Sequence, residues 1–406
     1  MKQLCRPDPG MCIVIISGLF REMTLLMKRT AMVLGVVLFP GILLATGLAA
    51  GSLEFPQPVN AQADQRPIDS ETIRQILSKV VEDGKVPGVM AAVISSRGLV
   101  ASGAAGVRKS GSDSLLTPRD KVHLGSCTKA MTCAMLATLV TEGRLDWDMT
   151  LTEVIPELKR AIHPDFHDIT LWELLTHRAA VEDCFTFDRK LTKEKRLDLV
   201  KDRLSAPSGL RRGEFSYSNL GYVAAACMAE RVSGLLWEDL METRLFQPLG
   251  MTSAGFGAPG PPGQIDQPWG HQRSWRGWRP DQTDCSEALS PAGRVHCSLD
   301  DWAAFLALFL TPQNSFLNAP VMAKLVTPVG YYAGGWGVTE SQPWAKGVAY
   351  SHNGSNARWF ASVVLAPALD RAYVVVTNSR DFGVTGDACR DMVNSLIKAD
   401  LGIGED

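Results

Sequence analysis

An excess of charge of one sign is the first thing that this sequence lacks. Its 406 residues contain 41 Lys and Arg against 43 Asp and Glu, for a formal net charge of -2. Domains that bind nucleic acid usually carry a clear positive excess, so nucleic acid is not the expected partner. Internal repeats and heptad runs are also missing, which excludes solenoids and coiled coils. What remains, with 46% hydrophobic residues, is one large or two interleaved globular domains with an ample core.

Paired cysteine motifs are missing as well. Seven of the nine cysteines follow residue 63, and none belongs to a Cys-x-x-Cys or a Cys/His cluster, so we do not expect zinc. Cys127, Cys133 and Cys227 lie in apolar helical patterns and are expected to be buried thiols. Cys285 and Cys297 flank a short turn and are candidates for a disulfide in an oxidising compartment.

One segment superficially resembles a metal site. Residues 163–168 combine two His with two Asp. Pro164 interrupts the helical spacing that would bring such ligands to one face, and no Glu-x-x-His pattern supports them. We therefore predict no metal site.

The first sixty residues differ in kind from the rest. Lys28 and Arg29 precede an apolar run over residues 31–50, and Ala61-Gln62-Ala63, ahead of Asp64, has the small-x-small pattern of a cleavage site. We interpret residues 1–63 as an export signal and leader, which predicts a periplasmic or extracellular protein. The stretch before Lys28 makes this signal long, which suggests that translation begins at Met27. The alternative is an uncleaved signal whose residues 31–50, close to the roughly 20 that a span needs, tether the protein to a membrane.

Residues 124–143 place a candidate nucleophile at the start of a helix. Nearly every residue from 130 to 140 is apolar or small, which is typical of a helix buried on all sides. Gly125 breaks the chain before it, so Ser126 is expected as N-cap or first-turn residue. Lys129 follows three residues later on the same face, within reach of the Ser126 hydroxyl. Because burial lowers the pKa of a lysine, Lys129 is a candidate base. The alternative is that Ser126 only caps the helix and Lys129 is a surface residue.

In the rest of the chain, the spacing of apolar residues changes from helical to strand-like from one part to the next. Helical spacing predicts helices at 70–83, 171–177, 222–232, 302–310 and 387–401. β-branched or small runs predict strands at 89–95, 99–107, 335–338, 348–351, 359–366 and 372–377.

Strands therefore gather at both ends of the mature chain, with helices between them. The fold class that this order predicts is α+β: one antiparallel sheet built from both ends, with flanking helices and an inserted, mostly helical domain. We assign residues 64–120 and 291–406 to the sheet domain and 121–290 to the insertion. Residues 255–290 are rich in Gly and Pro, show no period and are expected as an extended loop region. Their tryptophans either line a cleft or pack the loop down; these are Trp269, Trp275 and Trp278.

Two further motifs complete a resemblance. Ser126-Cys-Thr-Lys129, Tyr217-Ser-Asn219 and His352-Asn-Gly354, in this order, resemble the three motifs of the serine β-lactamase and penicillin-binding protein superfamily. The resemblance is to its class C β-lactamases, D-alanyl-D-alanine carboxypeptidases and β-lactamase-like esterases, and it covers roughly residues 70–400. Flanking segments support it: Leu174-Leu-Thr-His177, Pro291-Ala-Gly293, Gly335-Trp-Gly337 and Val376-Thr-Asn378.

The resemblance implies roles for the motif residues in acyl transfer. Ser126 would be the acylated nucleophile, with Lys129 as its base, held by Asn219. Tyr217 would pass the proton to the leaving group. The backbone N–H groups of Ser126 and Ser355 would stabilise the oxyanion.

The turn at residues 352–355 would bind the substrate, through His352, Asn353, Gly354 and Ser355. His352 stands where lactamases usually have Lys, which disfavours β-lactam hydrolysis. Arg294 and Arg358 are weaker candidates for binding a substrate carboxylate. We therefore expect an exported serine hydrolase, without cofactor, that acts on a small-molecule or peptide substrate, either an ester or a D-amino-acid amide. The alternatives are a class C-like β-lactamase and a penicillin-binding receptor or scaffold that is acylated without turnover.

Overall fold

The computed structural model describes residues 68–311, 316–381 and 383–403. The predicted leader over residues 1–63, its apolar run over 31–50 and the Ala61-Gln62-Ala63 motif lie outside these ranges. No helix in the described ranges is both long enough and apolar enough to cross a membrane.

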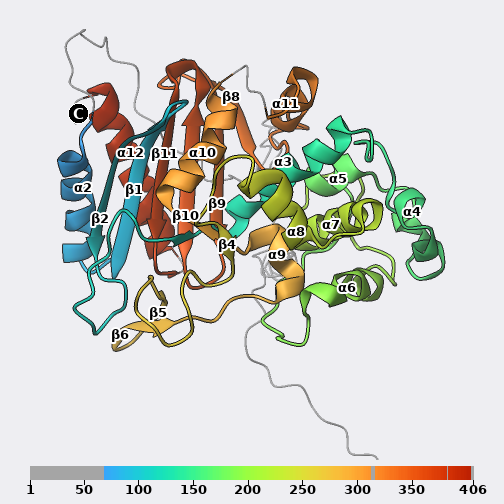
Figure 1. The fold of residues 1–406 in the computed structure, drawn as a ribbon, viewed down its shortest axis with the longest axis horizontal. Helices are drawn as coiled ribbons and strands as arrows, with labels where there is room; N and C mark the ends of the chain where they lie inside the picture. The colour runs from blue at the N-terminus through green and yellow to red at the C-terminus, as the bar shows by residue number, and fades with distance from the viewer. Residues whose placement is uncertain (1–67, 312–315, 382, 404–406) are drawn as a thin grey trace, which may run out of the picture. The chain divides into compact units, whose positions relative to one another are not determined.

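A six-stranded sheet forms one side of the fold, in the order β2-β1-β11-β10-β9-β8 (Figure 1). All neighbouring strands run antiparallel. Its strands are β1 (Gly88–Ser95), β2 (Gly98–Gly106), β8 (Gly337–Gln342), β9 (Gly347–Ser355), β10 (Phe360–Ala366) and β11 (Arg371–Thr377). Two strands come from the N-terminal part of the described chain and four from its C-terminal part, so the predicted α+β fold class is confirmed.

Both faces of the sheet are covered by helices because side chains alternate between two cores. In β1, Val89, Ala91 and Val93 belong to one apolar cluster, whereas Met90 and Ala92 belong to the other. The first cluster is closed by two helices, α2 (Ser70–Glu82) and α12 (Val384–Leu401). The second is closed by α10 (Leu299–Leu310) and continues into the helical region.

Most of the helices lie between β2 and β8 in the chain (Figure 1). Besides α10, they are α3 (Thr128–Thr141), α4 (Leu151–Val154), α5 (Leu171–Leu175), α6 (Arg196–Arg203), α7 (Asn219–Ser233), α8 (Trp237–Met241), α9 (Ser290–Gly293) and α11 (Ala319–Val326). α3 contacts α7, α8, α9 and α11, and this explains why no polar face was needed along it. A small sheet, β3 (Val122–His123), β7 (Val295–Cys297) and β4 (Gly255–Phe256), joins the start of α3 to the segment before α10. The boundaries proposed at 120/121 and 290/291 stay predictions.

The prediction of a purely irregular region over residues 255–290 was wrong. The region holds β4 and a hairpin, β5 (Gly270–Ser274) with β6 (Gly277–Asp281). Both strands are short and mostly polar, so they give no apolar alternation for sequence reasoning to detect. The hairpin closes through Trp275 and Arg276, and Gly277 adopts a positive φ of 107°.

The candidate disulfide is not formed. Cys285 and Cys297 are both free, buried thiols, like the other five cysteines of the described chain. Each lies in the continuous apolar core instead, where a cysteine acts as a small hydrophobic residue.

Candidate active site

Ser126 lies at the junction between the small sheet and the buried helix. It is the middle residue of a short 3-10 turn, η1 (Gly125–Cys127), and α3 begins at Thr128 with Cys127 as its N-cap. The prediction that Ser126 is the N-cap or a first-turn residue of the α-helix was therefore wrong, because a short 3-10 turn precedes the helix. Because the 3-10 turn runs directly into α3, Ser126 and Lys129 still share one face, and their Oγ and Nζ atoms are 3.1 Å apart.

Lys129 is completely buried and has three oxygen neighbours. Its Nζ lies 2.6 Å from Asn219 Oδ1 and 2.8 Å from the backbone oxygen of Ala292, in addition to Ser126 Oγ. Asn219 is held in turn by Asp183, whose Oδ1 accepts from both the backbone N and Nδ2 of Asn219, at 2.7 and 3.0 Å. The structure thus brings together Ser126, Lys129 and Asn219, which the sequence separated by up to 93 positions.

The surroundings of Lys129 favour the neutral amine. Burial lowers its pKa to about 7, and the nearby Asp183 carboxylate offsets only part of that effect. A neutral amine has two hydrogens and one lone pair. Asn219 Oδ1 and the Ala292 carbonyl can only accept, so they take the two hydrogens. The lone pair then faces Ser126 Oγ, as proton abstraction from that hydroxyl requires.

Tyr217 lies against the same pair but has the opposite protonation preference. Burial raises the pKa of its hydroxyl above the ordinary range, and a hydrogen bond with the Ser126 side chain offsets part of this rise. Its ring lies 4.7 Å from Lys129 Nζ. Near neutral pH, Tyr217 therefore keeps its proton and can donate it, whereas Lys129 can accept one.

His177, from the Leu174-Leu-Thr-His177 segment, fixes the turn that carries Tyr217. Its Nδ1 accepts a hydrogen bond from the backbone N of Ser218 at 3.0 Å, and its carbonyl accepts from Ser216 N at 2.8 Å. Its ring centroid lies 4.4 Å from that of Tyr217. His177 adopts a φ of 60°, unusual for a residue other than glycine. These contacts hold the Tyr217-Ser-Asn219 turn in place.

The end of β9 lies directly against the nucleophile turn. A Cβ atom added to Gly125 would stand 2.3 Å from the Ser355 amide nitrogen, and one added to Gly354 would stand 1.9 Å from the Leu124 oxygen and 2.8 Å from the Ser126 nitrogen. No side chain fits in either place. The two glycines therefore allow the backbone at Ser126 and the backbone at Ser355 to approach closely, as the expected oxyanion hole requires.

His352 is a neutral hydrogen-bonding group at this site. Its Nδ1 lies 2.7 Å from the Asn353 carbonyl oxygen, so Nδ1 carries the hydrogen, and Nε2 accepts from the Tyr332 hydroxyl at 3.0 Å. Burial, followed by the nearby Lys129 charge, lowers the pKa of His352 to about 3. The position therefore offers no cation near neutral pH. Asn353, the next residue, is exposed.

A buried polar cluster behind the nucleophile was missed by sequence reasoning. His123 Nε2 lies 2.9 Å from Asp284 Oδ2, while His123 Nδ1 accepts from the backbone N of Gly125 at 3.1 Å. Asn356 Nδ2 donates to Asp284 Oδ1 at 2.7 Å. The cluster thus links the residue before Ser126 to the residue after Ser355. The only signal in the sequence was polar residues next to the Ser126 and Ser355 motifs.

Both arginines considered for a substrate carboxylate are engaged with carboxylates of the protein. Arg294 Nε lies 3.3 Å from Asp284 Oδ2, and Arg358 Nε lies 2.6 Å from Asp281 Oδ2. Their side chains are largely buried, 13% and 11% exposed. Neither arginine is a ready partner for a substrate anion, since each would first have to leave its carboxylate.

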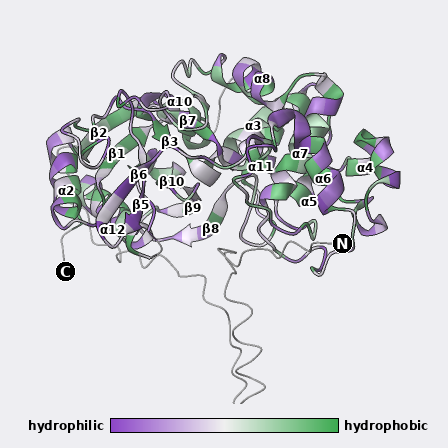
Figure 2. Ribbon diagram, turned by 90° about the horizontal axis from the view of Figure 1, so that it is seen from below, coloured by the Kyte–Doolittle hydropathy of each residue, from purple (hydrophilic) through white to green (hydrophobic). Residues whose placement is uncertain are grey.

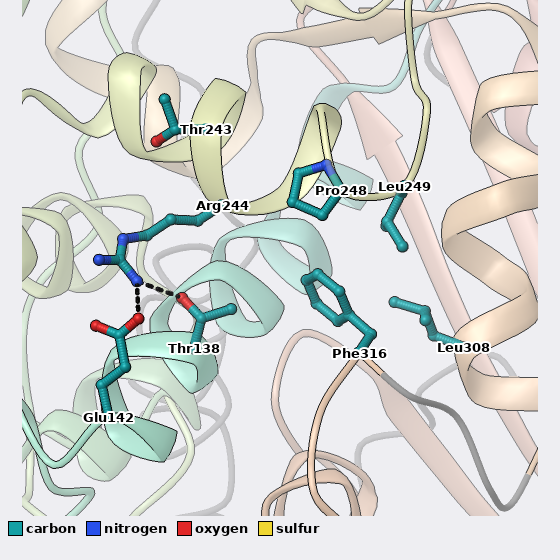
Figure 3. Close-up of a pocket in the computed structure, with 8 residues that line it drawn as sticks. All are labelled: Thr138, Glu142, Thr243, Arg244, Pro248, Leu249, Leu308 and Phe316. Atoms are coloured by element: carbon teal, nitrogen blue, oxygen red, sulfur yellow. Dashed lines mark hydrogen bonds and ion pairs between the residues drawn. The ribbon is translucent and has the colours of Figure 1, made fainter.

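Two cavities of the described chain lie away from this site. One, of about 500 Å³, lies toward the C-terminal end of α3, where Arg244 pairs with Glu142 and contacts Thr138 beside an apolar wall (Figure 3). The other, of about 750 Å³, lies between α2 and α12. No cluster of three or more His, Cys, Asp or Glu suited to a metal ion occurs within the ranges that the structure covers.

The fold and these contacts define the class of protein: an α+β protein with a Ser-x-x-Lys pair, its lysine buried, against the end of strand β9 of an antiparallel sheet. The sequence profile of the family described as Beta-lactamase matches residues 73–394. The chain therefore belongs to the Beta-lactamase family, and the resemblance found in its three motifs is confirmed.

Individual relatives are distant in sequence but close in fold. The unguisins hydrolase ungD' from Aspergillus campestris (strain IBT 28561) is 23% identical over 365 residues, which cover 84% of this chain and 67% of the hydrolase. The octameric penicillin-binding protein homologue from Pyrococcus abyssi aligns with a TM-score of 0.69 at 20% identity, over 83% of this chain and 79% of that one. The D-amino acid amidase from Ochrobactrum anthropi SV3 aligns with a TM-score of 0.67 at 20% identity, over 81% and 97%. These structures establish the shared fold.

Proposed function

We propose that this protein is an exported serine hydrolase that forms an acyl-enzyme at Ser126 and cleaves an ester or a D-amino-acid amide. The observation that carries the proposal is the placement of Lys129 Nζ, which has two oxygen acceptors for its hydrogens and Ser126 Oγ at 3.1 Å. The family membership supports a hydrolase. The likeness to an unguisins hydrolase and to a D-amino acid amidase is consistent with an amide or ester bond as the target.

In the proposed reaction, Ser126 Oγ attacks the carbonyl carbon of the substrate while Lys129 Nζ takes its proton. The negative charge that forms on the carbonyl oxygen is stabilised by the N–H groups of Ser126 and Ser355, each worth about 3 kcal/mol of barrier. Tyr217 then donates its proton to the leaving group and recovers one from Lys129, so that proton and electron counts balance. Water releases the acyl group from Ser126 in the second half of the cycle.

The neutral His352 favours a substrate without a carboxylate at that position. A lysine there would provide a fixed positive charge, but an imidazole whose pKa is about 3 provides none near neutral pH. Arg294 and Arg358 are paired with aspartates. We therefore propose esterase or D-amino-acid amidase activity ahead of β-lactam hydrolysis.

The decisive experiment is a substrate screen on the purified full chain. Short-chain p-nitrophenyl esters, D-phenylalanine amide, a D-Ala-D-Ala peptide and a chromogenic cephalosporin would be compared by kcat/KM. Steady turnover of esters or D-amino-acid amides that disappears in Ser126→Ala supports the proposal. A stoichiometric burst that then stops supports a penicillin-binding receptor, and faster turnover of the cephalosporin supports a β-lactamase.

Covalent labelling separates the proposed nucleophile from its neighbouring thiol. Ser126→Ala should abolish labelling by a fluorophosphonate, whereas Cys127→Ala should retain it, because burial raises the pKa of the Cys127 thiol well above its ordinary value. Labelling that survives Ser126→Ala but not Cys127→Ala would contradict a serine mechanism.

Export is proposed from the sequence of the leader. N-terminal sequencing of the protein isolated from the producing cell should begin at Asp64, and cell fractionation should find the protein outside the cytoplasm. An N-terminus that still includes residues 31–50, in the membrane fraction, would favour the tether instead.

A further inference from the structure

The β5–β6 hairpin has no role in the proposed reaction. It forms a separate two-stranded sheet, seen near the lower edge of Figure 1. Residues 269–280 contain three arginines and three tryptophans, and the one acidic residue of the two strands, Asp281, lies at the base, where it pairs with Arg358. Such a local excess of cations stands out in a chain whose formal net charge is -2.

The base of the hairpin is anchored in the fold. His271 is fully buried, and its two ring nitrogens contact the Asn378 carbonyl oxygen at 2.7 Å and the backbone N of Ser110 at 2.9 Å. A Cβ added to Gly270 would stand 2.5 Å from Arg358 Cβ. The backbone N of Arg380 donates to the His271 carbonyl at 3.1 Å. These contacts fix the direction in which the tip projects.

The tip, in contrast, is exposed and aromatic. Trp275 is 87% exposed, more than any other large hydrophobic residue of the described chain. The Arg276 guanidinium lies 4.3 Å from the centroid of the Trp275 ring. Across the hairpin, Arg273 pairs with Trp278 and lies 4.9 Å from its ring centroid. Arg279, the residue after Trp278, is also exposed. None of the three arginines forms an ion pair with a carboxylate within the described residues.

We propose that this hairpin tip, defined by Arg273, Trp275, Arg276, Trp278 and Arg279, docks the protein on an anionic phospholipid membrane surface. Tryptophan is amphipathic and prefers the level of the lipid headgroups, where its ring is half in apolar surroundings. Arginine binds phosphate through two parallel N–H groups, and each basic side chain near an anionic surface adds to the attraction. The tip combines the two within the turn and the adjoining strand ends, over residues 273–279.

The geometry favours a lipid surface over an anionic polymer. A protein that binds single-stranded nucleic acid uses a cationic groove that follows the backbone, with aromatic rings stacked along it. Here Arg276 lies in the two-residue turn and Arg273 and Arg279 lie on the two strands beside it, and no hairpin residue lines either of the two cavities described above. A projecting turn with Trp275 at its end is suited to insertion between headgroups.

Vesicle binding by the purified full chain tests the proposal. Association would be measured by sedimentation with vesicles of phosphatidylcholine alone and of equimolar phosphatidylcholine and phosphatidylglycerol, across a salt series. The ratio between the two vesicles is the readout, because an apolar segment that simply inserts would not distinguish the headgroups. We expect tighter binding to the anionic vesicles, weakened by salt.

Two hairpin variants and one control make the test specific. Neutralising Arg273, Arg276 and Arg279 together to Gln should weaken anionic-vesicle binding by about a hundredfold and flatten its salt dependence. Trp275→Ala should weaken binding but keep the salt dependence. The control changes three other exposed arginines, Arg119, Arg160 and Arg189, to Gln, with the same loss of charge. Hydrolysis of a p-nitrophenyl ester, if the wild-type protein shows it, and circular dichroism report on folding.

Each outcome decides for or against the proposal. Loss of the anionic preference in the hairpin variant, with the control unchanged, supports it. Equal losses in the hairpin variant and the control would show that only the overall charge of the protein matters, which would overturn the proposal. Equal binding of the wild-type protein to both vesicle types would also overturn it. Wild-type protein that binds heparin or duplex DNA but not anionic vesicles would point to an anionic polymer, and this would also overturn it.

Discussion

His123 and Asp284, 161 positions apart in the sequence, are joined by a buried contact of 2.9 Å between Nε2 and Oδ2. Because Nδ1 of His123 accepts from the Gly125 backbone N, the ring hydrogen is on Nε2 and points at the carboxylate. Burial alone would raise the pKa of Asp284, but His123 and then Arg294 more than offset it and hold that pKa below its usual range. The pair braces the turn that carries Ser126.

Asp284→Asn is predicted to lower kcat by about tenfold or more with a smaller change in KM, because an oxyanion hole that is displaced loses transition-state stabilisation. Asn356 cannot rotate to compensate, since its Oδ1 already accepts from the backbone N of Arg358 and of Trp359. One buried donor is therefore left without an acceptor, and the variant should also lose about 3 kcal/mol of stability.

Asp301→Asn is the matched control for this prediction. Asp301 is also a buried carboxylate, and its Oδ2 accepts from the N and Oγ of Ser253 at 2.7 and 2.5 Å, but none of its contacts involves the motif residues. It should lose stability without the change in kcat. If both variants lose stability alike and keep wild-type kcat, Asp284 has only a structural role.

The pH dependence of both activity and stability should report on Lys129. Activity should rise as the pH passes about 7, where the amine loses its proton and becomes a base. In the unfolded chain, Lys129 keeps its proton up to its ordinary pKa of 10.5. Between these two values the unfolded state binds more protons than the folded state, so this lysine makes the free energy of unfolding rise with pH.

Lys129→Met tests the assignment through stability, independently of substrate. Between pH 7 and about 9, the slope of unfolding free energy against pH should be smaller in the variant by up to about 1.4 kcal/mol per pH unit. Chemical denaturation at several pH values measures this slope. Equal slopes in the two proteins would mean that Lys129 has an ordinary pKa in the fold.

Gly354→Ala is predicted to abolish most activity because the new methyl group would collide with the Leu124 oxygen and crowd the Ser126 amide. Moving one oxyanion donor costs about 10²–10³ in kcat. Gly209→Ala is the control: its Cβ would meet nothing closer than Glu182 Oε1 at 3.7 Å. Kinetics of both variants, with thermal unfolding as a check on folding, make the comparison. Wild-type kcat in a folded Gly354→Ala protein would rule out an oxyanion hole at this place.

His352→Lys should change substrate preference rather than simply lower the rate. The lysine adds a positive charge where the wild-type imidazole is neutral, so kcat/KM for a cephalosporin, which has a carboxylate, should rise relative to that for a p-nitrophenyl ester. The comparison would be made at about pH 8, where His352 is neutral and Lys129 is mostly deprotonated.

His352→Gln controls for the loss of the imidazole in that comparison. It keeps a polar side chain that can accept from the Tyr332 hydroxyl but adds no charge. The ratio of the two substrates should stay near its wild-type value. A wild-type protein that already prefers the cephalosporin would show that another cation holds the carboxylate and that the esterase preference is wrong.

Local sequence located the strands of the six-stranded sheet and Ser126, the proposed nucleophile. The predicted ends were wrong for β8 and β9, which each continue four residues further, so the predicted turn at residues 352–355 is the end of β9. The hairpin of β1 and β2 was predicted within one or two residues of its observed bounds, because its small and β-branched runs are interrupted by a clear turn. The contact between Ser126 and Lys129 follows from three-residue spacing alone. The apolar residues after Lys129 favoured its burial, and the structure decided against the alternative of a surface lysine.

The order of the three motifs predicted a common site, but only the tertiary structure decided how its parts meet. Several of its contacts join segments that are separated in the chain. They are the close approach of Gly125 to Gly354, the hydrogen bond from the Tyr332 hydroxyl to His352, and the contact between His123 and Asp284. Such contacts between single polar residues or glycines leave no periodic pattern in a sequence. The same holds for Arg294 and Arg358, whose pairing with aspartates depends on which carboxylate the fold brings near. Sequence spacing therefore determined which groups could react, and long-range packing decided their protonation, their partners and the space around them.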